Sequence, residues 1–375
     1  MIYLDYSATT PVDEEVLNSF MKVSRDYIGN ANSLHKLGLD SKKLMQKSCE
    51  QVASLLGVKP TEVIFTSSAS EANNMALKGV LEKYQNRGRH IITTKLEHSS
   101  ILETVSYLES VGYEVDFVPV KEDGQVDFEV LKNLIRNDTV LVSIHHVNSE
   151  VGIVQDIHKI GTFLKMNHPK IFFHVDGTQS VGKIPVSLDN IDLFTCSAHK
   201  FYGLKGIACL IKRENVGIIP LIHGGKSQTE FRSGTPSVPL MVSFAKALRL
   251  ALLNLEQTHE HVKKLNLKLR ELLLELEGVH VNTPNDGIPH ILNISVLGIK
   301  PEVMLHALEQ DEIYISTKTA CSKDNSDSLS LTAMGRIKKI ASSSIRISIS
   351  HLTSDEDIDK FFEIFKKLVK NLKLK

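Results

Sequence analysis

The chain has 375 residues, enough for about two domains, and its 42% hydrophobic and 23% charged residues are typical of a globular protein. Forty-four basic and 44 acidic side chains give a formal net charge of zero. This balance argues against a dedicated nucleic-acid or membrane-surface protein, because either class needs a basic excess. The four cysteines form no C-x-x-C pair, which excludes a disulfide framework and a zinc ribbon, and we expect no metal.

The amino terminus, MIYLDYSATTP, lacks the basic start and apolar core of a signal peptide. No apolar run approaches the roughly 18 residues that a membrane-spanning helix needs. We therefore expect a cytoplasmic protein with reduced thiols and with no membrane or direct nucleic-acid partner.

The first half of the chain alternates helical and strand patterns. The predicted helices are 13–28, 36–56, 72–85, 99–111, 127–134 and 155–167. The predicted strands are 62–66, 90–94, 114–118, 139–145 and 171–175, and 191–195 is a further strand-like run. Such alternation predicts an α/β fold with a parallel sheet covered by helices on both faces. Ligands bind beyond the carboxyl ends of such strands, so the loops after the strands are the candidate site.

The second half changes character. Residues 242–277 read as one long helix closed by Gly278. Strands near 290–296 and 343–350 and helices at 301–310 and 355–373 follow it. We predict a large α/β domain over 14–249 and a smaller α+β domain built from 1–13 and 250–375.

Two strand ends carry the most informative residues. Asp176 and Gln179 follow the apolar run IFFHV, and Ser197, His199 and Lys200 follow IDLFT. A lysine at such a position suits a Schiff base, and a carboxylate on a neighbouring strand can pair with a pyridinium nitrogen. From spacing alone, a surface lysine and a turn aspartate explain the pattern equally well.

A third junction, residues 66–73 (TSSASEAN), follows a strand and opens a helix, where backbone N–H groups can bind phosphate. A plain capping motif is the alternative. His98 ends another such junction and could lie against an aromatic ring, although a lone histidine is more often structural. Arg346, in the apolar strand SSIRISIS, needs a partner if it is buried, either a substrate carboxylate or an internal aspartate.

Ten segments occur in an order that resembles the cysteine desulfurases. They are YLDYSATTP, GNANSLHKLG, FTSSASEANN, LEHSSI, HHVNSEVGIVQDI, HVDGTQSVGK, CSAHKFYGLKG, RSGTPSV, TACS and SSIRIS. The resemblance runs from Tyr3 to about Asp359, and the SAHK and DGTQ blocks are its most specific parts. It implies fold type I of the pyridoxal-phosphate (PLP) enzymes, class V aminotransferase group, with a mostly parallel seven-stranded sheet in the large domain.

The resemblance also implies roles for single residues. Lys200 is similar to the Schiff-base lysine, Asp176 to the pyridinium partner, Gln179 to the residue that bonds the phenolate oxygen, and His98 to the residue that stacks on the ring. The implied phosphate-binding residues are Ala69, Ser70, Ser197 and His199, with Thr235 reaching the cofactor of a partner subunit in a homodimer.

For the substrate, the resemblance implies Asn148 near cofactor and substrate, Arg346 as the carboxylate clamp, Asn30 in the segment 30–33, and Cys321 as the nucleophile. His98 is a candidate proton shuttle. Cys321 stands in a polar stretch, 319–327, whose composition predicts a mobile loop. The surrounding TKTAC differs from the family's usual Ser-Gly-Ser-Ala-Cys, which affects loop flexibility and partner choice more than chemistry.

The implied function is conversion of L-cysteine to L-alanine, with sulfur held as a persulfide on Cys321 for an acceptor protein. The acceptor could be an iron–sulfur scaffold, a tRNA sulfurtransferase or a thiamin-pathway carrier, and GNANSLH resembles a branch found beside tRNA 4-thiouridine synthesis. Two alternatives remain open. One is another PLP reaction, such as selenocysteine lysis or transamination, and the other is a non-catalytic scaffold for sulfur assembly.

Overall fold

The structure is a computed structural model that describes residues 1–317 and 327–373. Cys321 and nearly all of the predicted loop around it lie outside the described residues. The prediction of a mobile loop at 319–327 therefore stays a prediction.

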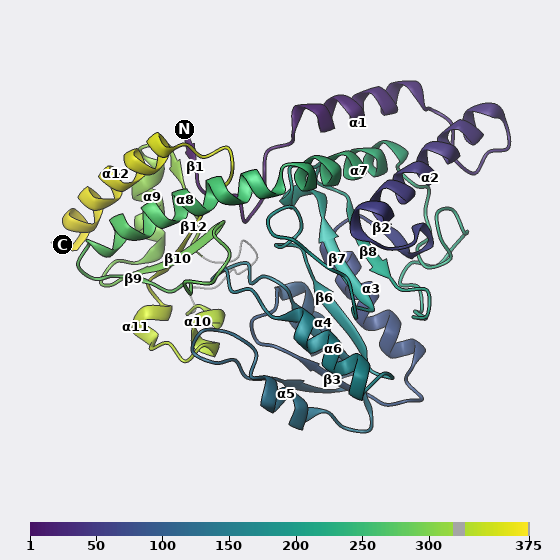
Figure 1. Ribbon diagram of the computed structural model, residues 1–375, viewed down its shortest axis with the longest axis horizontal. Coiled ribbons are helices and arrows are strands. Elements are labelled where there is room, and N and C mark those ends of the chain that lie inside the picture. The colour runs from purple at the N-terminus through teal and green to yellow at the C-terminus, as the bar shows by residue number, and fades with distance from the viewer. Residues whose placement is uncertain (318–326, 374–375) are drawn as a thin grey trace.

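A seven-stranded sheet forms the centre of the larger part of the molecule (Figure 1). Its strands are β2 (Val63–Thr66), β3 (His90–Thr93), β4 (Glu114–Phe117), β5 (Thr139–His145), β6 (Phe172–Asp176), β7 (Leu193–Ser197) and β8 (Ala208–Lys212), in the order β2-β8-β7-β6-β5-β3-β4. Strand β8 runs antiparallel to both of its neighbours, β2 and β7, whereas the other neighbouring pairs of this sheet are parallel. The predicted α/β fold with a mostly parallel seven-stranded sheet is confirmed.

Helices cover both faces of this sheet. They are α1 (Glu14–Asp26), α2 (Lys36–Leu56), α3 (Ala69–Lys83), α4 (Ser99–Ser110), α5 (Phe128–Leu134), α6 (Ile157–Asn167) and α7 (Val238–Leu253). One hydrophobic core joins α1, α2, α6 and α7 to one face, and a second core joins α3 and α4 to the other. Successive strand residues point to opposite faces, so Val175 packs in the first core while Asp176 points to the side of α3 and α4.

A second group of elements has its own core. It contains the antiparallel strands β9 (Val279–Val281), β10 (Ile291–Val296) and β12 (Ser344–Ser348), and the parallel pair β1 (Ile2–Tyr3) and β11 (Ile313–Tyr314). The helices in this core are α8 (Leu255–Leu274), α9 (Pro301–Glu309) and α12 (Asp355–Lys373). Ile2 and Leu4 belong to this core, although they begin the chain. The short helices α10 (Leu329–Ala333) and α11 (Lys338–Ala341) pack in a separate cluster with Leu96, Val151 and Ile153. The domain boundaries at 13 and 249 stay a prediction.

The prediction of one long helix over 242–277 is wrong. The structure has two helices, α7 and α8, which meet at Asn254 with a bend of 65°. They connect the seven-stranded sheet to the second group of elements (Figure 1). Asn254 leaves the helical conformation (φ −104°, ψ 11°), as suits a residue whose side chain competes for backbone hydrogen bonds. Helix α7 also begins earlier than predicted, at Val238 with Pro239 in its first turn, where a missing N–H costs nothing.

Among the described residues, no single helix is both long and apolar enough to cross a membrane. Helices α7 and α8 reach that length and composition only as a bent pair, and α7 buries Met241, Phe244 and Leu248 in the core of the larger part.

Candidate active site

The carboxyl ends of five strands meet around one cavity of about 230 Å³. Residues that follow β2, β3, β5, β6 and β7 line it, together with residues of the amino-terminal segment and Arg346 of β12. The lining set includes nine predicted site residues: Ala69, Ser70, His98, Asn148, Asp176, Gln179, His199, Lys200 and Arg346. The sheet therefore brings together side chains that are up to 277 positions apart in the sequence (69 to 346).

Three predicted residues lie elsewhere. Ser197 is buried at the end of β7 but is absent from the lining set. Asn30 and Thr235 are exposed on loops and do not line the cavity of their own chain. The predicted nucleophile, Cys321, lies outside the described residues.

Lys200 reaches into the cavity from the turn after β7. Its Nζ donates hydrogen bonds of 2.7 Å to the backbone carbonyl oxygens of Ser7 and Ala8. The carbonyl of Ser7 also accepts from Gln179 Nε2 at 2.9 Å. The amino-terminal segment thus holds two predicted cofactor residues through backbone atoms.

Lys183 fixes the other end of the Gln179 amide. Its Nζ is buried and donates to Gln179 Oε1 at 2.5 Å. Burial, followed by the charges of Lys200 and Arg346, lowers the pKa of Lys183 well below its usual value. Since the Ser7 carbonyl on the opposite side can only accept, Gln179 must turn Nε2 toward it and Oε1 toward Lys183.

The carboxylate of Asp176 ends β6 and is 6% exposed. It accepts from Thr178 N at 3.0 Å and from Asn73 Nδ2 at 2.8 Å. Burial alone would raise the pKa of Asp176. The hydrogen bonds from Thr178, the electrostatic effect of the nearby His98 and the hydrogen bond from the Asn73 amide outweigh burial and lower this pKa below its usual value. The site therefore holds an ionised carboxylate suited to a protonated ring nitrogen.

The opposite end of the site is the start of α3. The predicted start at Ala72 is wrong by three residues, because Ser68 caps the helix by accepting from Glu71 N and the helix begins at Ala69. The Glu71 carboxylate pairs with Arg232 at 2.9 Å, which balances its charge. Ser68, Ala69 and Ser70 line the cavity, so the positive end of α3 and two hydroxyls are available to a phosphate.

Two histidines of the cavity are held neutral. Burial lowers the pKa of His199 to about 4, with the charges of Lys200, Lys205 and Lys183 acting in the same direction. Burial also lowers the pKa of His98, against the opposing effect of Asp176. His98 caps α4, and its Nδ1 accepts from Ser100 N at 3.1 Å.

Arg346 is 1% exposed and already has an internal partner, one of the two possibilities left open by the sequence. Its Nη2 donates to Asp5 Oδ1 at 2.8 Å and its Nη1 to the Ser149 carbonyl at 2.9 Å. Its buried Nε has no partner among the described residues. Arg346 thus lines the cavity with one N–H bonded to an aspartate, one bonded to a backbone carbonyl, and Nε–H without a partner in the described structure.

The amide of Asn148 shapes the loop after β5. Its Oδ1 accepts from the backbone N–H groups of Glu150 and Val151, and its Nδ2 donates to the Leu96 carbonyl at 2.9 Å. These bonds tie the loops after β5 and β3 together. Asn148 therefore holds the cavity wall, whatever it contributes to ligand binding.

Beside Asp176, the structure places a buried pair that the sequence analysis did not predict. His145 is the neighbour of Asp176 in the sheet, and its Nδ1 lies 2.8 Å from Glu97 Oε1. His145 lines the cavity, whereas Glu97 lies behind it. In the described part of the chain, no three His, Cys, Asp or Glu side chains cluster so as to hold a metal ion.

The three cysteines among the described residues are free thiols that are partly or fully buried. Burial raises the pKa of Cys49 to about 11. Cys196 and Cys209 face each other across β7 and β8 and are fully buried in the core, on the sheet face opposite to the cavity. None of these thiols lines the cavity.

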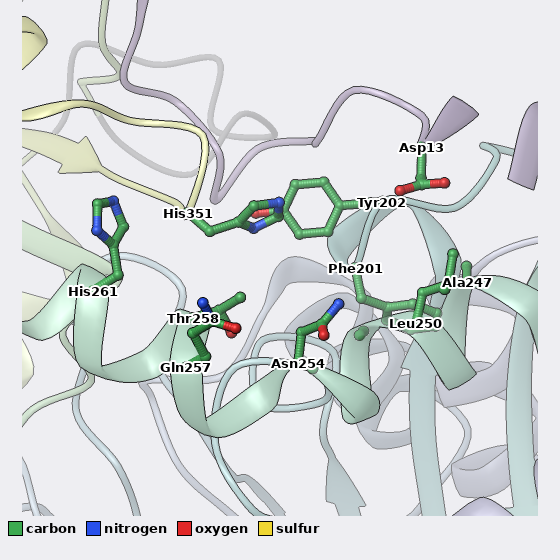
Figure 2. Close-up of a pocket in the computed structure, with 12 residues that line it drawn as sticks. Asp13, Phe201, Tyr202, Ala247, Leu250, Asn254, Gln257, Thr258, His261 and His351 are labelled. Carbon is green, nitrogen blue, oxygen red and sulfur yellow. The ribbon is translucent and has the colours of Figure 1, made fainter. Parts of the chain in front are cut away.

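A larger cavity of about 460 Å³ lies where α7 meets α8 (Figure 2). Figure 2 shows His351 and Tyr202 on one wall, across from Asn254, Gln257 and Thr258 on the helices. It contains none of the predicted site residues. Size alone therefore does not identify the active site, whereas the convergence of strand ends does.

The sequence family described as Aminotransferase class-V matches residues 2–361. The chain is 36% identical to "Cysteine desulfurase IscS" of Dictyoglomus turgidum over 99% of its length and 95% of that protein. It is 39% identical to the protein of the same name from Buchnera aphidicola, over 99% of this chain and 93% of that one. The chain belongs to the cysteine desulfurase group of the class V aminotransferases. The resemblance drawn from the sequence is confirmed.

Solved structures agree with this assignment. A "NIFS-LIKE PROTEIN" superposes with a TM-score of 0.93 at 38% identity, covering 99% of both chains. A structure named "SspA in complex with cysteine" superposes with a TM-score of 0.83 at 31% identity, covering 94% of this chain and all of that one. The fold type I architecture of this desulfurase-family chain is thereby confirmed.

Sequence reasoning missed several residues that shape the site. Lys183 could have been found, because a lysine four positions after Gln179 in the apolar stretch SVGKIPV needs a partner. Asn73 also carried a signal, since it interrupts the apolar face of α3 between Ala72 and Met75. The carbonyls of Ser7 and Ala8 carried none, because any residue provides a backbone oxygen.

A buried histidine on β6, two residues before Asp176, should make the stability of the folded chain depend on pH. His174 is fully buried, with hydrogen bonds to Ser143 Oγ at 2.9 Å and Thr195 Oγ1 at 3.1 Å, and burial lowers its pKa to about 4. The unfolded chain, with an ordinary histidine pKa near 6.5, binds this proton first. The free energy of unfolding should therefore fall by about 2 kcal/mol per such histidine between pH 7.5 and pH 5.

Urea unfolding at these two pH values measures the effect. His174→Asn should reduce the pH dependence by about this 2 kcal/mol, whereas His158→Asn, at an exposed position on α6, should leave it unchanged. An equal pH dependence in wild type and His174→Asn would contradict the assignment.

Proposed function

We propose that this chain is a pyridoxal 5′-phosphate-dependent cysteine desulfurase that releases alanine from L-cysteine and passes the sulfur to an acceptor protein. The supporting observation is the meeting of Lys200, Asp176 and His98 with the start of α3 in one cavity. The curated relatives at 36–39% identity carry the name cysteine desulfurase, and one structural neighbour was solved with cysteine.

The donor set of the cavity fits the cofactor. A ring nitrogen that must stay protonated requires a buried anion, and Asp176 provides one. A phosphate requires N–H and hydroxyl donors, which the start of α3 provides through Ala69 and Ser70. A phenolate oxygen requires a donor, and Gln179 lines the cavity with an NH₂ group that uses one hydrogen for the Ser7 carbonyl and has a second one. Lys200 is the amine for the covalent link, and His98 is the ring for stacking.

The bound cofactor supplies an electron sink that stabilises negative charge at the substrate Cα. Lys200, an amine that lines the cavity, would accept the Cα proton at Nζ. Asp176 keeps the ring nitrogen protonated. Arg346 binds the substrate carboxylate with the donors that face the cavity, and Asn148 holds the wall beside it.

Cys321 is the proposed nucleophile for the sulfur step. Its thiolate attacks the sulfur of cysteine, the Cβ–S bond breaks as an S–S bond forms, and the released electron pair takes up a proton to give alanine. The balance is one cysteine and one thiol for one alanine and one persulfide, so no external oxidant is required. The three described thiols are poor substitutes, because none of them lines the cavity and two of them, Cys196 and Cys209, are buried.

The homodimer, the acceptor and the location complete the proposal. Thr235 is exposed and absent from its own cavity, which supports a role at a partner subunit's cofactor. Free described cysteines fit a reducing cytosol. An iron–sulfur scaffold or a tRNA sulfurtransferase is the proposed acceptor, and isolating proteins bound to the Cys321 persulfide would identify it.

If Lys200 forms the covalent link, the purified protein is yellow, and borohydride attaches the cofactor to the Lys200 peptide. Lys200→Ala should retain cofactor only without a covalent bond and lose activity by about 10³-fold or more. Lys205→Ala, at a nearby exposed lysine, should behave as wild type. Normal turnover by Lys200→Ala would refute the whole site.

Arg346 and Asp5 can be tested as a pair. Arg346→Lys should raise the KM for cysteine by about tenfold or more, because lysine lacks the planar fork that matches a carboxylate. Asp5→Asn keeps the fork and removes its internal partner, so it should not raise KM, although it should lower thermal stability. An unchanged KM in Arg346→Lys would show that the arginine serves only the ion pair.

Cys321→Ser separates desulfuration from other reactions on this fold. The variant should still bind cofactor and cysteine, because Lys200, Asp176 and Arg346 are unchanged, but it should release no alanine and carry no persulfide by mass spectrometry. Cys49→Ala is the matched control and should stay active. Native turnover in Cys321→Ser would favour a transaminase-like reaction, and absence of turnover in wild type would favour a scaffold.

A further inference from the structure

A chain of hydrogen bonds runs from Asp176 to His98 through a buried amide. Asn73, on α3, is 0% exposed. Its Nδ2 lies 2.8 Å from Asp176 Oδ2 and 2.9 Å from Ser100 Oγ. Ser100 Oγ in turn lies 2.9 Å from His98 Nδ1. Two residues of the proposed cofactor site are thus joined by two residues that have no assigned role.

The chemistry of the partners fixes the direction of each bond. The ionised Asp176 can only accept, so Asn73 must turn its NH₂ group toward it, and the same group donates its second hydrogen to Ser100 Oγ. That leaves the Ser100 hydroxyl hydrogen for His98 Nδ1. Asn73 Oδ1 has no partner among the described residues, so no competing bond holds the amide in the opposite orientation.

The backbone of Ser100 strengthens the same conclusion. Ser100 N–H donates to His98 Nδ1 at 3.1 Å, and a backbone N–H cannot accept. Nδ1 is therefore an acceptor, and the neutral imidazole carries its proton on Nε2. A proton on Nδ1 would face two donors, so protonation of the neutral ring at this nitrogen is disfavoured.

We propose that Asn73 is a positioning residue that orients Asp176 and, through Ser100, holds His98 in its Nε2–H tautomer. The role in cofactor binding rests on the proposed function, whereas the tautomer does not. The ionisable groups that act on His98 are Asp176, Lys200 and Glu97, and none of them contacts Nδ1 in the described structure. The protonation of Nδ1 is therefore determined by Ser100, which donates to it, and by Asn73, which orients Ser100.

The test uses histidine labelled with ¹⁵N in the ring and long-range ¹H–¹⁵N correlation spectra, recorded without cofactor. His98→Gln identifies the His98 signals. The wild type should show the Nε2–H tautomer at neutral pH. In Ser100→Ala one donor to the neutral ring is lost, so the titration midpoint of His98 should move to higher pH. Ser99→Ala, the neighbouring half-buried serine, should leave it unchanged.

Asn73→Ala should move the His98 midpoint in the same direction and weaken binding of pyridoxal 5′-phosphate by about tenfold, because Asp176 loses a charged hydrogen bond. Asn74→Ala is the control for the His98 spectrum, since Asn74 bonds only the Ser70 carbonyl on the same helix. Circular dichroism checks the fold, and Ser100→Ala keeps the test valid if the buried Asn73→Ala variant unfolds.

An Nδ1–H tautomer in wild type, or a His98 titration in Ser100→Ala identical to that in Ser99→Ala, would overturn the proposal. Failure of the proposed function would look different. The wild type would then bind no pyridoxal 5′-phosphate, while the His98 spectrum still responded to Ser100→Ala.

Discussion

The carboxylate of Asp176 is buried at the end of β6, and a buried charge is stable only where donors surround it. This requirement explains the neighbouring residues. Thr178 N and Asn73 Nδ2 supply the donors, and Asn73 can reach Asp176 because α3 starts at Ala69 and packs on the same face of the sheet. The helix that offers its positive end to a phosphate therefore also stabilises the carboxylate at the opposite end of the cavity.

The first 13 residues form the second constraint. Ile2 and Tyr3 pair with β11, and Asp5 forms an ion pair with Arg346. The carbonyls of Ser7 and Ala8 accept from Lys200, and Thr10 accepts from the backbone of the turn after Lys200. This segment therefore contacts the turn after β7 as well as β11 and β12. Because most of these contacts are made by backbone atoms, they fix the course of the segment, and the identity of a residue matters mainly at Asp5 and Thr10, whose side chains form bonds.

The sequence predicted the sheet and the residues that carry ionisable chemistry, because hydrophobic periodicity and strand ends are local signals. It did not predict the bend at Asn254 or the start of α3, which depend on tertiary contacts and on one or two capping residues. The partner of Arg346 was left open for a physical reason. An ion pair between positions 5 and 346 is set by the fold, and no local pattern encodes it.

Three side-chain amides show how the cavity is prepared for a ligand. Asn73 is oriented by a carboxylate that only accepts, Gln179 by the Ser7 carbonyl that only accepts from its Nε2, and Asn148 by two backbone N–H groups that only donate. An amide whose oxygen and nitrogen could be exchanged would have to reorganise when a ligand binds. Here each amide has a partner that can act only as a hydrogen-bond donor or only as an acceptor. The amides are therefore already oriented in the folded protein, and ligand binding does not carry the entropic cost of ordering them. The Asp176 carboxylate, the Ser7 carbonyl and two backbone N–H groups thereby determine the orientation of these three amides.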